Sequence, residues 1–183
     1  MHGIVMVGLR EFVLDAFDER TWELLKREAT DRTDFYLPLQ TYPDEELLRL
    51  VEVAVERLEI PQDDLLFSFG AFLVGSLSET YNAYLDDRWD ALDLLANTES
   101  VIHTALRDRT TGEFRPPALR TERVDEDTVV VEYTSNRQIC PFARGLIDGL
   151  GEQFGEELVL EEPLCMQAGD DRCKFVVTRA HGS

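Results

Sequence analysis

One histidine lies alone inside an apolar stretch of the sequence. His103 follows Val101 and Ile102 and precedes Ala105 and Leu106, whereas the other two histidines lie near the ends of the chain. Two interpretations fit such a residue. It is either a core imidazole that bonds to backbone carbonyls, or an imidazole that projects into an apolar pocket as the axial ligand of a haem iron. The histidine alone does not decide between them.

A group of polar residues follows about thirty positions later. Tyr133, Ser135 and Arg137 alternate in what reads as an extended segment, and alternate side chains of a strand point to the same face. A phenol, a hydroxyl and a guanidinium together form a site for an oxyanion, because a guanidinium binds carboxylates through two parallel hydrogen bonds. The alternative is a polar strand face that meets solvent. One imidazole and one anion clamp together are what a haem with two propionates requires.

All three cysteines lie in the C-terminal part of the chain. Cys140, Cys165 and Cys173 are separated by 24 and 7 intervening residues, without a Cys-x-x-Cys pair. The spacing is therefore a weak signal for zinc, and an odd number of cysteines does not indicate a secreted disulfide framework. Two interpretations stay open: a structural zinc site, or three reduced and partly buried thiols.

Sequence signatures of catalysis are scarce. The chain has no Gly-rich loop that ends in Lys-Ser/Thr, no His-Glu-x-x-His and no Gly-x-Ser-x-Gly. Peroxidase chemistry at a haem would lack an obvious distal histidine or arginine. We therefore expect a protein that is not an enzyme.

Apolar periodicity predicts the elements that position these residues. We expect helices over residues 9–26, with a break near 18–21, and over 44–58, 61–77 and 89–106. After a change of character near residue 111, we expect strands near 119–123, 128–133, 158–164 and 173–178, and a helix over 142–154. The predicted fold class is α+β in a single domain, with a helical part (1–111) followed by a small antiparallel β-sheet that carries one packed helix (112–183).

The composition excludes several classes of partner. The chain has 183 residues, with 18 Lys and Arg against 37 Asp and Glu, a net charge of −19. Such a surface repels phosphate backbones and anionic lipids, so we expect neither nucleic acid nor membrane as a partner. No apolar run is long enough to span a bilayer and the first residues do not read as a signal peptide, so we expect a cytoplasmic protein.

Residues 133–137 spell a Tyr-x-Ser-x-Arg motif, about thirty positions after a lone histidine. In both respects the sequence resembles the H-NOX (haem nitric oxide/oxygen binding) domains, bacterial relatives of the haem domain of soluble guanylate cyclase. The opening residues 1–5, the helix start at 42–46 and the segment 145–149 also fit the family pattern. The resemblance covers nearly the whole chain, and the joint order of its motifs is specific.

The resemblance implies a role for each of these residues. It implies a haem b buried between the helices and the sheet, with His103 as the proximal iron ligand. It also implies that Tyr133, Ser135 and Arg137 clamp the propionates and that Pro117 presses on the haem and distorts it. The residues implied to line the distal and flanking surfaces are Val5, Leu9, Leu73, Leu77, Phe142 and Leu146.

The resemblance also bears on the gas that is sensed. Oxygen-binding members carry a tyrosine five positions after the arginine of the motif, and Phe142 stands there in this chain. Because bound O₂ needs a hydrogen-bond donor and NO or CO does not, we expect binding of NO and CO without a stable O₂ complex. In the family, NO releases the proximal histidine and the haem relaxes. The signal then passes to a separate protein, commonly a histidine kinase or a cyclic-di-GMP enzyme.

Some members of the family hold zinc with cysteines at these positions and a histidine just before the second one. That histidine is absent here, because Glu161-Glu162-Pro163-Leu164 precedes Cys165. Glu162 would then supply an oxygen as the fourth ligand, or the site would be incomplete. An alternative function follows from the cysteines alone, namely a haem-free module that senses redox state through zinc and thiols.

Overall fold

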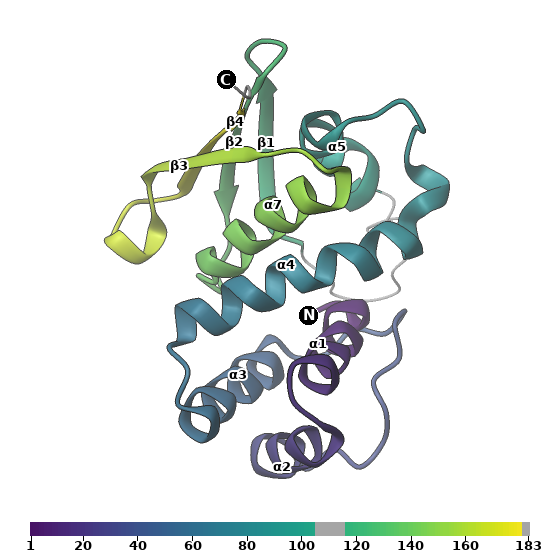
Figure 1. Cartoon of the computed structure of the whole chain (residues 1–183). Coiled ribbons are helices and arrows are strands. Elements are labelled where there is room, and N and C mark those ends of the chain that lie inside the picture. The colour runs from purple at the N-terminus through teal and green to yellow at the C-terminus, as the bar shows by residue number, and fades with distance from the viewer. Residues whose placement is uncertain (105–115, 181–183) are drawn as a thin grey trace.

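The computed structural model describes residues 1–104 and 116–180 of the chain (Figure 1). Four helices come first, in the order α1 (Gly3–Ala16), α2 (Glu19–Ala29), α3 (Asp44–Leu58) and α4 (Gln62–Tyr81). A 3₁₀ turn (Asn82–Tyr84), the helix α5 (Ala91–Asn97) and the π-helical segment η2 (Thr98–His103) follow. The C-terminal part holds β1 (Ala118–Arg123), β2 (Thr128–Thr134), α7 (Cys140–Phe154), β3 (Leu158–Leu164), a 3₁₀ turn (Met166–Ala168) and β4 (Cys173–Arg179).

The sheet is antiparallel throughout, with the strand order β1-β2-β4-β3. The helix α7 packs against this sheet, and α4 lies beside α7 across the middle of the molecule. The helices α1, α2 and α3 lie on the other side of α4 (Figure 1). The α+β class is therefore confirmed, with helices first and a small sheet with one packed helix second. The expected division between residues 111 and 112 lies outside the described residues.

Local sequence signals explain where several helices begin. The side chain of Asp18 accepts a hydrogen bond from the backbone N–H of Thr21 at 2.7 Å and so caps α2. Asp90 and Asp93 form a reciprocal capping box at the start of α5. Three acidic residues in the first turn of α3 complement the helix dipole.

Several predicted boundaries were wrong, including the end of α4, which runs to Tyr81 rather than to residue 77. The first helix begins at Gly3 rather than near residue 9, because the imidazole of His2 caps it by accepting from the N–H of Ile4. The C-terminal helix begins at Cys140 rather than at residue 142. The helix expected over 89–106 is α-helical only as far as Asn97 and then widens into η2, and residues 105 and 106 lie outside the described residues.

Two apolar clusters fill the interior. One lies among α1–α4, the other lies between α5, α7 and the sheet, and Leu146 packs against both. The helices α4 and α7 approach each other closely at glycines. A Cβ atom on Gly70 would lie 2.3 Å from the carbonyl oxygen of Phe142, and one on Gly145 would lie 2.0 Å from that of Phe67. No larger residue fits this contact without moving one helix.

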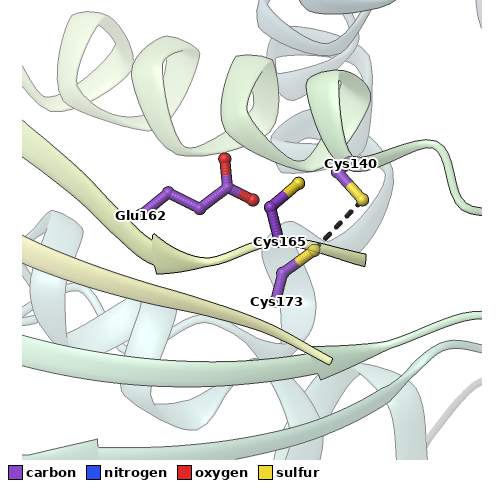
Figure 2. Close-up of side chains that lie close together, drawn as sticks. All are labelled: Cys140, Glu162, Cys165 and Cys173. Carbon is purple, nitrogen blue, oxygen red and sulfur yellow. Dashed lines mark hydrogen bonds between the residues drawn. The ribbon is translucent and has the colours of Figure 1, made fainter. Parts of the chain in front are cut away.

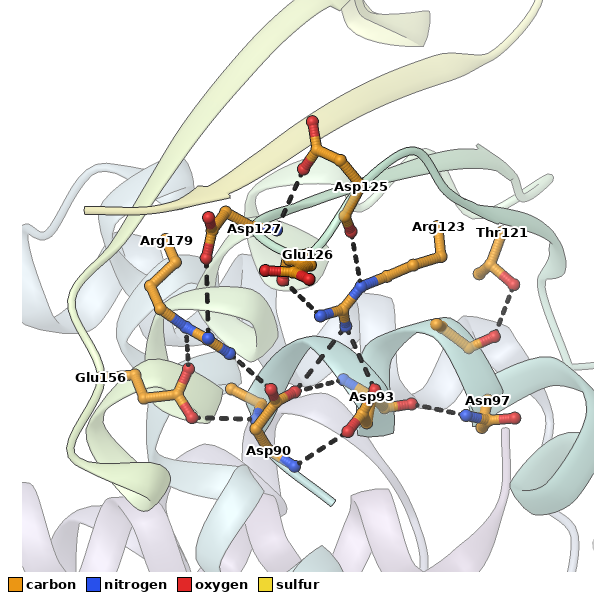
Figure 3. Close-up of polar contacts among 12 residues, drawn as sticks. Asp90, Asp93, Asn97, Thr121, Arg123, Asp125, Glu126, Asp127, Glu156 and Arg179 are labelled. Atoms are coloured by element: carbon orange, nitrogen blue, oxygen red, sulfur yellow. Dashed lines mark hydrogen bonds and ion pairs between the residues drawn. The ribbon is translucent and has the colours of Figure 1, made fainter. Parts of the chain in front are cut away.

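A network of ion pairs fixes the start of α5 to the ends of two strands of the sheet (Figure 3). Arg179, the last residue of β4, lies 2.5 Å from Asp90 and 2.9 Å from Glu156. Arg123, the last residue of β1, lies 3.2 Å from Asp93. The segment that leads to His103 is thereby tied to β1, to β4 and to the end of α7.

No helix in the described parts of the chain combines the length and the apolar character needed to cross a membrane.

Candidate functional site

An apolar cavity of about 260 Å³ lies where the helices meet the sheet. Its walls come from α1, α4, the α5–η2 segment, β1, β2, α7 and β4, and most of the lining surface is apolar. Leu9 and Ser135 do not line it: Leu9 lies in the core among α1–α4, and Ser135 is buried in the turn after β2. Nine of the residues that the sequence singled out do line it: His103, Pro117, Tyr133, Arg137, Val5, Leu73, Leu77, Phe142 and Leu146.

His103 is the last residue of η2, and its side chain is 14% exposed. Its Nδ1 lies 2.8 Å from Oε2 of Glu99, one turn earlier in the same segment. A carboxylate beside Nδ1 favours the tautomer that carries its proton there, and the lone pair then lies on Nε2. The imidazole is therefore prepared to bind a metal through Nε2. Nothing in the sequence pattern singled out Glu99.

Tyr133 and Ser135 are both buried at the end of β2. Burial raises the pKa of the Tyr133 phenol to about 12, although the Ser135 hydroxyl acts in the opposite direction. The phenol therefore stays protonated and can donate a hydrogen bond at any ordinary pH. Ser135 Oγ accepts a hydrogen bond from the backbone N–H of Arg137 at 3.3 Å, and this contact shapes the turn after the strand.

Arg137 does not lie on a strand, contrary to the prediction of one extended segment that carries Tyr133, Ser135 and Arg137. Strand β2 ends at Thr134, and the N–H of Gln138 donates to the carbonyl of Ser135 at 3.2 Å in a turn where Gln138 has a φ of 51°. The alternation of side chains along the strand therefore ends at Thr134, and the turn brings Arg137 to the cavity instead.

The guanidinium of Arg137 forms an ion pair with Asp44, at 2.9 Å between Nε and Oδ1. The same oxygen accepts from the N-terminal ammonium group of Met1 at 2.6 Å. Burial opposes the charge of Asp44, but these two cations hold the pKa of its carboxyl below the usual range. The sequence marks Asp44 only as part of the helix start at 42–46, so its pairing with Arg137 was not predicted.

The α4 wall of the cavity extends further than the sequence indicated. Ser78 and Tyr81 also line it, one turn beyond Val74 and Leu77. Their positions continue the apolar stripe of α4 at helical spacing, which is the signal that would have found them. On the neighbouring wall, formed by α7, the ring of Phe142 lies 5.1 Å from that of Phe69 on α4, so Phe142 is held by packing.

A second candidate site lies where α7, β3 and β4 meet (Figure 2). Cys140 begins α7, Glu162 lies on β3, Cys165 follows β3 and Cys173 begins β4. One ligand atom from each of these four residues lies within 4.8 Å of all the others. The structure therefore brings all four residues together, although their spacing in the sequence is only a weak signal for zinc.

The four ligand atoms suit a tetrahedral metal ion. The sulfur atoms of Cys140 and Cys173 are 3.1 Å apart, and no cysteine is in a disulfide. Ligand distances of 3.1 to 4.8 Å bracket the separation of about 3.8 Å that zinc–sulfur bonds of about 2.3 Å require. Burial raises the pKa of Cys173 and that of Cys165, so both thiols hold their protons unless a cation replaces them.

Glu162 would be the fourth ligand, in place of the histidine of a set of three cysteines and one histidine. Its Oε2 lies 2.7 Å from Nη1 of Arg144. Its Oε1 is buried, and within the described residues it has no hydrogen-bond partner. A buried carboxylate oxygen without a donor is costly, and a metal ion would satisfy it. The donor set of three sulfurs and one oxygen therefore fits zinc.

Comparisons with known proteins point to one family. No curated protein matches the chain. An H-NOX crystal structure from S. oneidensis in the Fe(II)NO state matches with a TM-score of 0.91 and 24% identity, over 99% of this chain and 100% of that one. The NMR structure of a Shewanella oneidensis H-NOX domain in the Fe(II)CO state matches with a TM-score of 0.88 and 24% identity, over 100% of both chains.

A third structure is the solution structure of the IWP-051-bound H-NOX protein from Shewanella woodyi in the Fe(II)CO state. It matches with a TM-score of 0.82 and 28% identity, over 98% of this chain and 95% of that one. The family model described as haem-NO-binding matches residues 2–162, which hold His103, the Tyr-x-Ser-x-Arg motif and nearly the whole cavity wall. The chain therefore belongs to the haem-NO-binding, or H-NOX, family.

Proposed function

We propose that this haem-binding gas-sensor domain binds NO at ferrous haem b and does not hold O₂ stably. In this proposal residues 1–183 form one domain, and His103 binds the iron. Tyr133 and Arg137 meet the propionates with Ser135 behind them, and Pro117 presses on the ring. The observation that carries the proposal is the apolar cavity with His103 and Arg137 on its walls. One imidazole and one guanidinium on a mostly apolar wall match the polar groups of a haem.

Phe142 supports the choice of NO over O₂. It lines the cavity at the position of the family's hydrogen-bonding tyrosine, and its ring carries no donor. Bound O₂ carries partial negative charge and gains from a donor, whereas NO binds ferrous haem strongly without one. Related H-NOX structures are described with NO and with CO.

We further propose that His103 transmits the signal. Because His103 ends the α5–η2 segment, loss of its bond to iron would free that segment from the cavity. The chain would then act on a separate protein, and we name a histidine kinase or a cyclic-di-GMP enzyme as the class of partner. The protein itself would not be an enzyme. A cytoplasmic location stays a prediction from the sequence.

Absorption spectroscopy tests the haem and its ligands. Protein produced with haem should show a Soret band that shifts with NO and with CO, and the ferrous form should show no lasting oxy spectrum in air. His103→Gly should lose haem or need added imidazole, whereas Ser100→Ala on the same segment should behave as the wild type. A wild-type protein that is folded and supplied with haem, yet shows no Soret band, would refute the haem proposal. A stable oxy spectrum would refute the NO selectivity.

We also propose a zinc ion bound by Cys140, Glu162, Cys165 and Cys173. The buried Oε1 of Glu162 and the convergence of three sulfurs support it. The alternative function, a haem-free module that senses redox state through zinc and thiols, is disfavoured by the apolar cavity. Protein purified without chelator should hold one zinc per chain. Cys140→Ser should lose most of it, and Glu162→Gln should weaken its binding. A zinc-free wild type would refute the site.

A further inference from the structure

A carboxylate lies beside the nitrogen of His103 that would not bind iron. Oε2 of Glu99 is 2.8 Å from Nδ1 of His103, within the range of a charge-assisted hydrogen bond. The pair lies four residues apart on one segment, and its side chains are 14% exposed for His103 and 28% for Glu99. Limited exposure keeps water from competing fully for either partner.

The local backbone holds Glu99 in place. The segment from Thr98 to His103 is π-helical, so the N–H of Thr104 reaches the carbonyl of Glu99 five residues earlier. The hydroxyl of Thr104 donates to the same carbonyl at 3.2 Å. Thr98 turns its hydroxyl to the carbonyl of Leu94 at 2.8 Å, which helps to widen the turn. Both the backbone and the side chain of Glu99 therefore bond to the turn that carries His103.

We infer that Glu99 is a positioning residue that sets the strength of the bond between His103 and the haem iron. This inference rests on the proposed function, in which His103 is the iron ligand. A carboxylate that accepts the Nδ1 proton fixes the ring orientation and makes Nε2 a stronger electron donor. Glu99 therefore opposes the release of His103 and sets how much NO-bound protein reaches the state without the histidine.

The test compares Glu99→Gln with the wild type in haem-loaded protein. Glutamine keeps the size of the side chain and an accepting oxygen but removes the charge, so the hydrogen bond to Nδ1 becomes roughly half as strong. Glu99→Asp keeps the charge on a shorter chain and serves if Glu99→Gln takes up haem poorly. Ser100→Ala is the matched control, because Ser100 is exposed, adjacent and bonded only locally, to the carbonyl of Asn97 at 3.2 Å.

Three measurements report on the bond itself. Resonance Raman gives the iron–histidine stretching frequency of the unliganded ferrous protein, which should fall in Glu99→Gln and stay unchanged in Ser100→Ala. The ratio of five- to six-coordinate NO complex, read from the Soret band, should rise roughly threefold to tenfold when the charged hydrogen bond becomes neutral. Haem loss to a scavenger should quicken by about tenfold, as for other outer-shell partners of a metal-bound histidine.

The outcomes separate this inference from the function on which it rests. A wild type without a Soret band refutes both. A haem-loaded wild type whose stretching frequency and NO coordination ratio match those of Glu99→Gln refutes only the role of Glu99. If Glu99→Gln forms no haem complex, Glu99→Asp decides, because its side chain is one methylene shorter and withdraws the carboxylate from Nδ1. A frequency equal to that of the wild type would then refute the role, and a lowered one would support it.

Discussion

Phe142 lies on α7 with its ring against Phe69 and its edge in the cavity wall. A hydroxyl at the tip of this ring would be the smallest change that adds a donor to that part of the wall. The residue is partly buried in an existing contact, so a tyrosine can occupy the same rotamer.

Phe142→Tyr is therefore expected to create an O₂ complex in the ferrous protein. A hydrogen bond to a partially charged oxygen contributes about 1.5–3 kcal/mol, so O₂ affinity should rise by roughly 10- to 100-fold. The measurement is the absorption spectrum of ferrous protein under air. Phe72→Tyr is the control, because Phe72 contacts Phe12 at a centroid distance of 5.6 Å and does not line the cavity. An oxy spectrum in both variants, or in neither, would contradict the role given to position 142.

The buried thiols predict a dependence of stability on pH. In the zinc-free protein burial raises the pKa of Cys173 and of Cys165 above the usual thiol value of about 8.5. The folded chain then holds these protons more tightly than the unfolded chain. Stability is thus complete below about pH 8.5 and falls as the pH rises above it.

Urea unfolding between pH 7 and pH 10 measures this effect. The midpoint of zinc-free protein should drop above about pH 8.5, and stoichiometric zinc should flatten the curve, because metal-bound thiolates carry no proton to lose. Cys173→Ala should reduce the slope of the zinc-free protein. Equal slopes with and without zinc would count against the proposed ligands.

Residue types and spacing predicted the polar members of the cavity, but for partly wrong reasons. Tyr133 was placed by strand alternation, and that is how it reaches the cavity. Arg137 reaches it through a turn in which Gln138 has a left-handed backbone conformation. A glutamine in the sequence does not predict such a turn. Asp44 pairs with Arg137, and Glu99 contacts His103. The chain has 37 acidic residues, and the sequence does not show which of them make such contacts.

At the scale of elements, the contact between α4 and α7 places the strictest limit on side-chain size. Glycines at 70, 145 and 149 let the two backbones meet, and any Cβ on Gly145 would lie 2.0 Å from a carbonyl oxygen of α4. Both helices also line the cavity.

Gly145→Ala is expected to destabilise the protein by about 1–3 kcal/mol, because α7 must move away from α4. Gly75→Ala on α4 is the matched control: a Cβ there meets nothing within 4 Å, so loss of backbone freedom in the unfolded chain should stabilise by up to about 1 kcal/mol. Urea unfolding measures both variants. Equal destabilisation by the two would show that the helix contact is not the cause.

The elements themselves were largely predictable. Apolar periodicity, proline and acidic first turns located α3 and α4, and β-branched runs around a turn located the hairpin of β1 and β2. The π-helical winding of η2 was not predictable, because it depends on how Thr98 and Thr104 share carbonyls once the segment is folded. The start of α1 was missed because a histidine rarely serves as its cap.

At the scale of the whole molecule, the main electrostatic feature is the net negative charge. A charge of −19 on 183 residues means that self-repulsion opposes the folded state. Individual ion pairs, such as those of Arg179 with Asp90 and Glu156, act in the opposite direction but involve few charges. The same acidic exterior would attract a basic surface on a signalling partner.

Added salt is therefore expected to raise the melting temperature. Going from about 0.01 M to about 0.1 M NaCl shortens the screening length from about 30 Å to about 10 Å, which weakens repulsion across the molecule more than contact ion pairs. Calorimetry at a fixed pH of about 7 measures the change. A melting temperature that falls with salt would mean that the ion pairs outweigh the repulsion. Arg179→Gln should make the rise steeper, because it removes attractive pairs that salt weakens.

The position of Phe175 has a consequence for how the protein is made. This buried residue of β4 lines the cavity, as do Met1 and Val5 at the other end of the sequence. The strand β4 pairs with both β2 and β3, so the wall that holds Phe175 cannot form until that strand has been synthesised and has left the ribosome. The cavity is therefore not closed until β4 has been made, and a cofactor that depends on its complete wall is acquired only after that strand has joined β2 and β3.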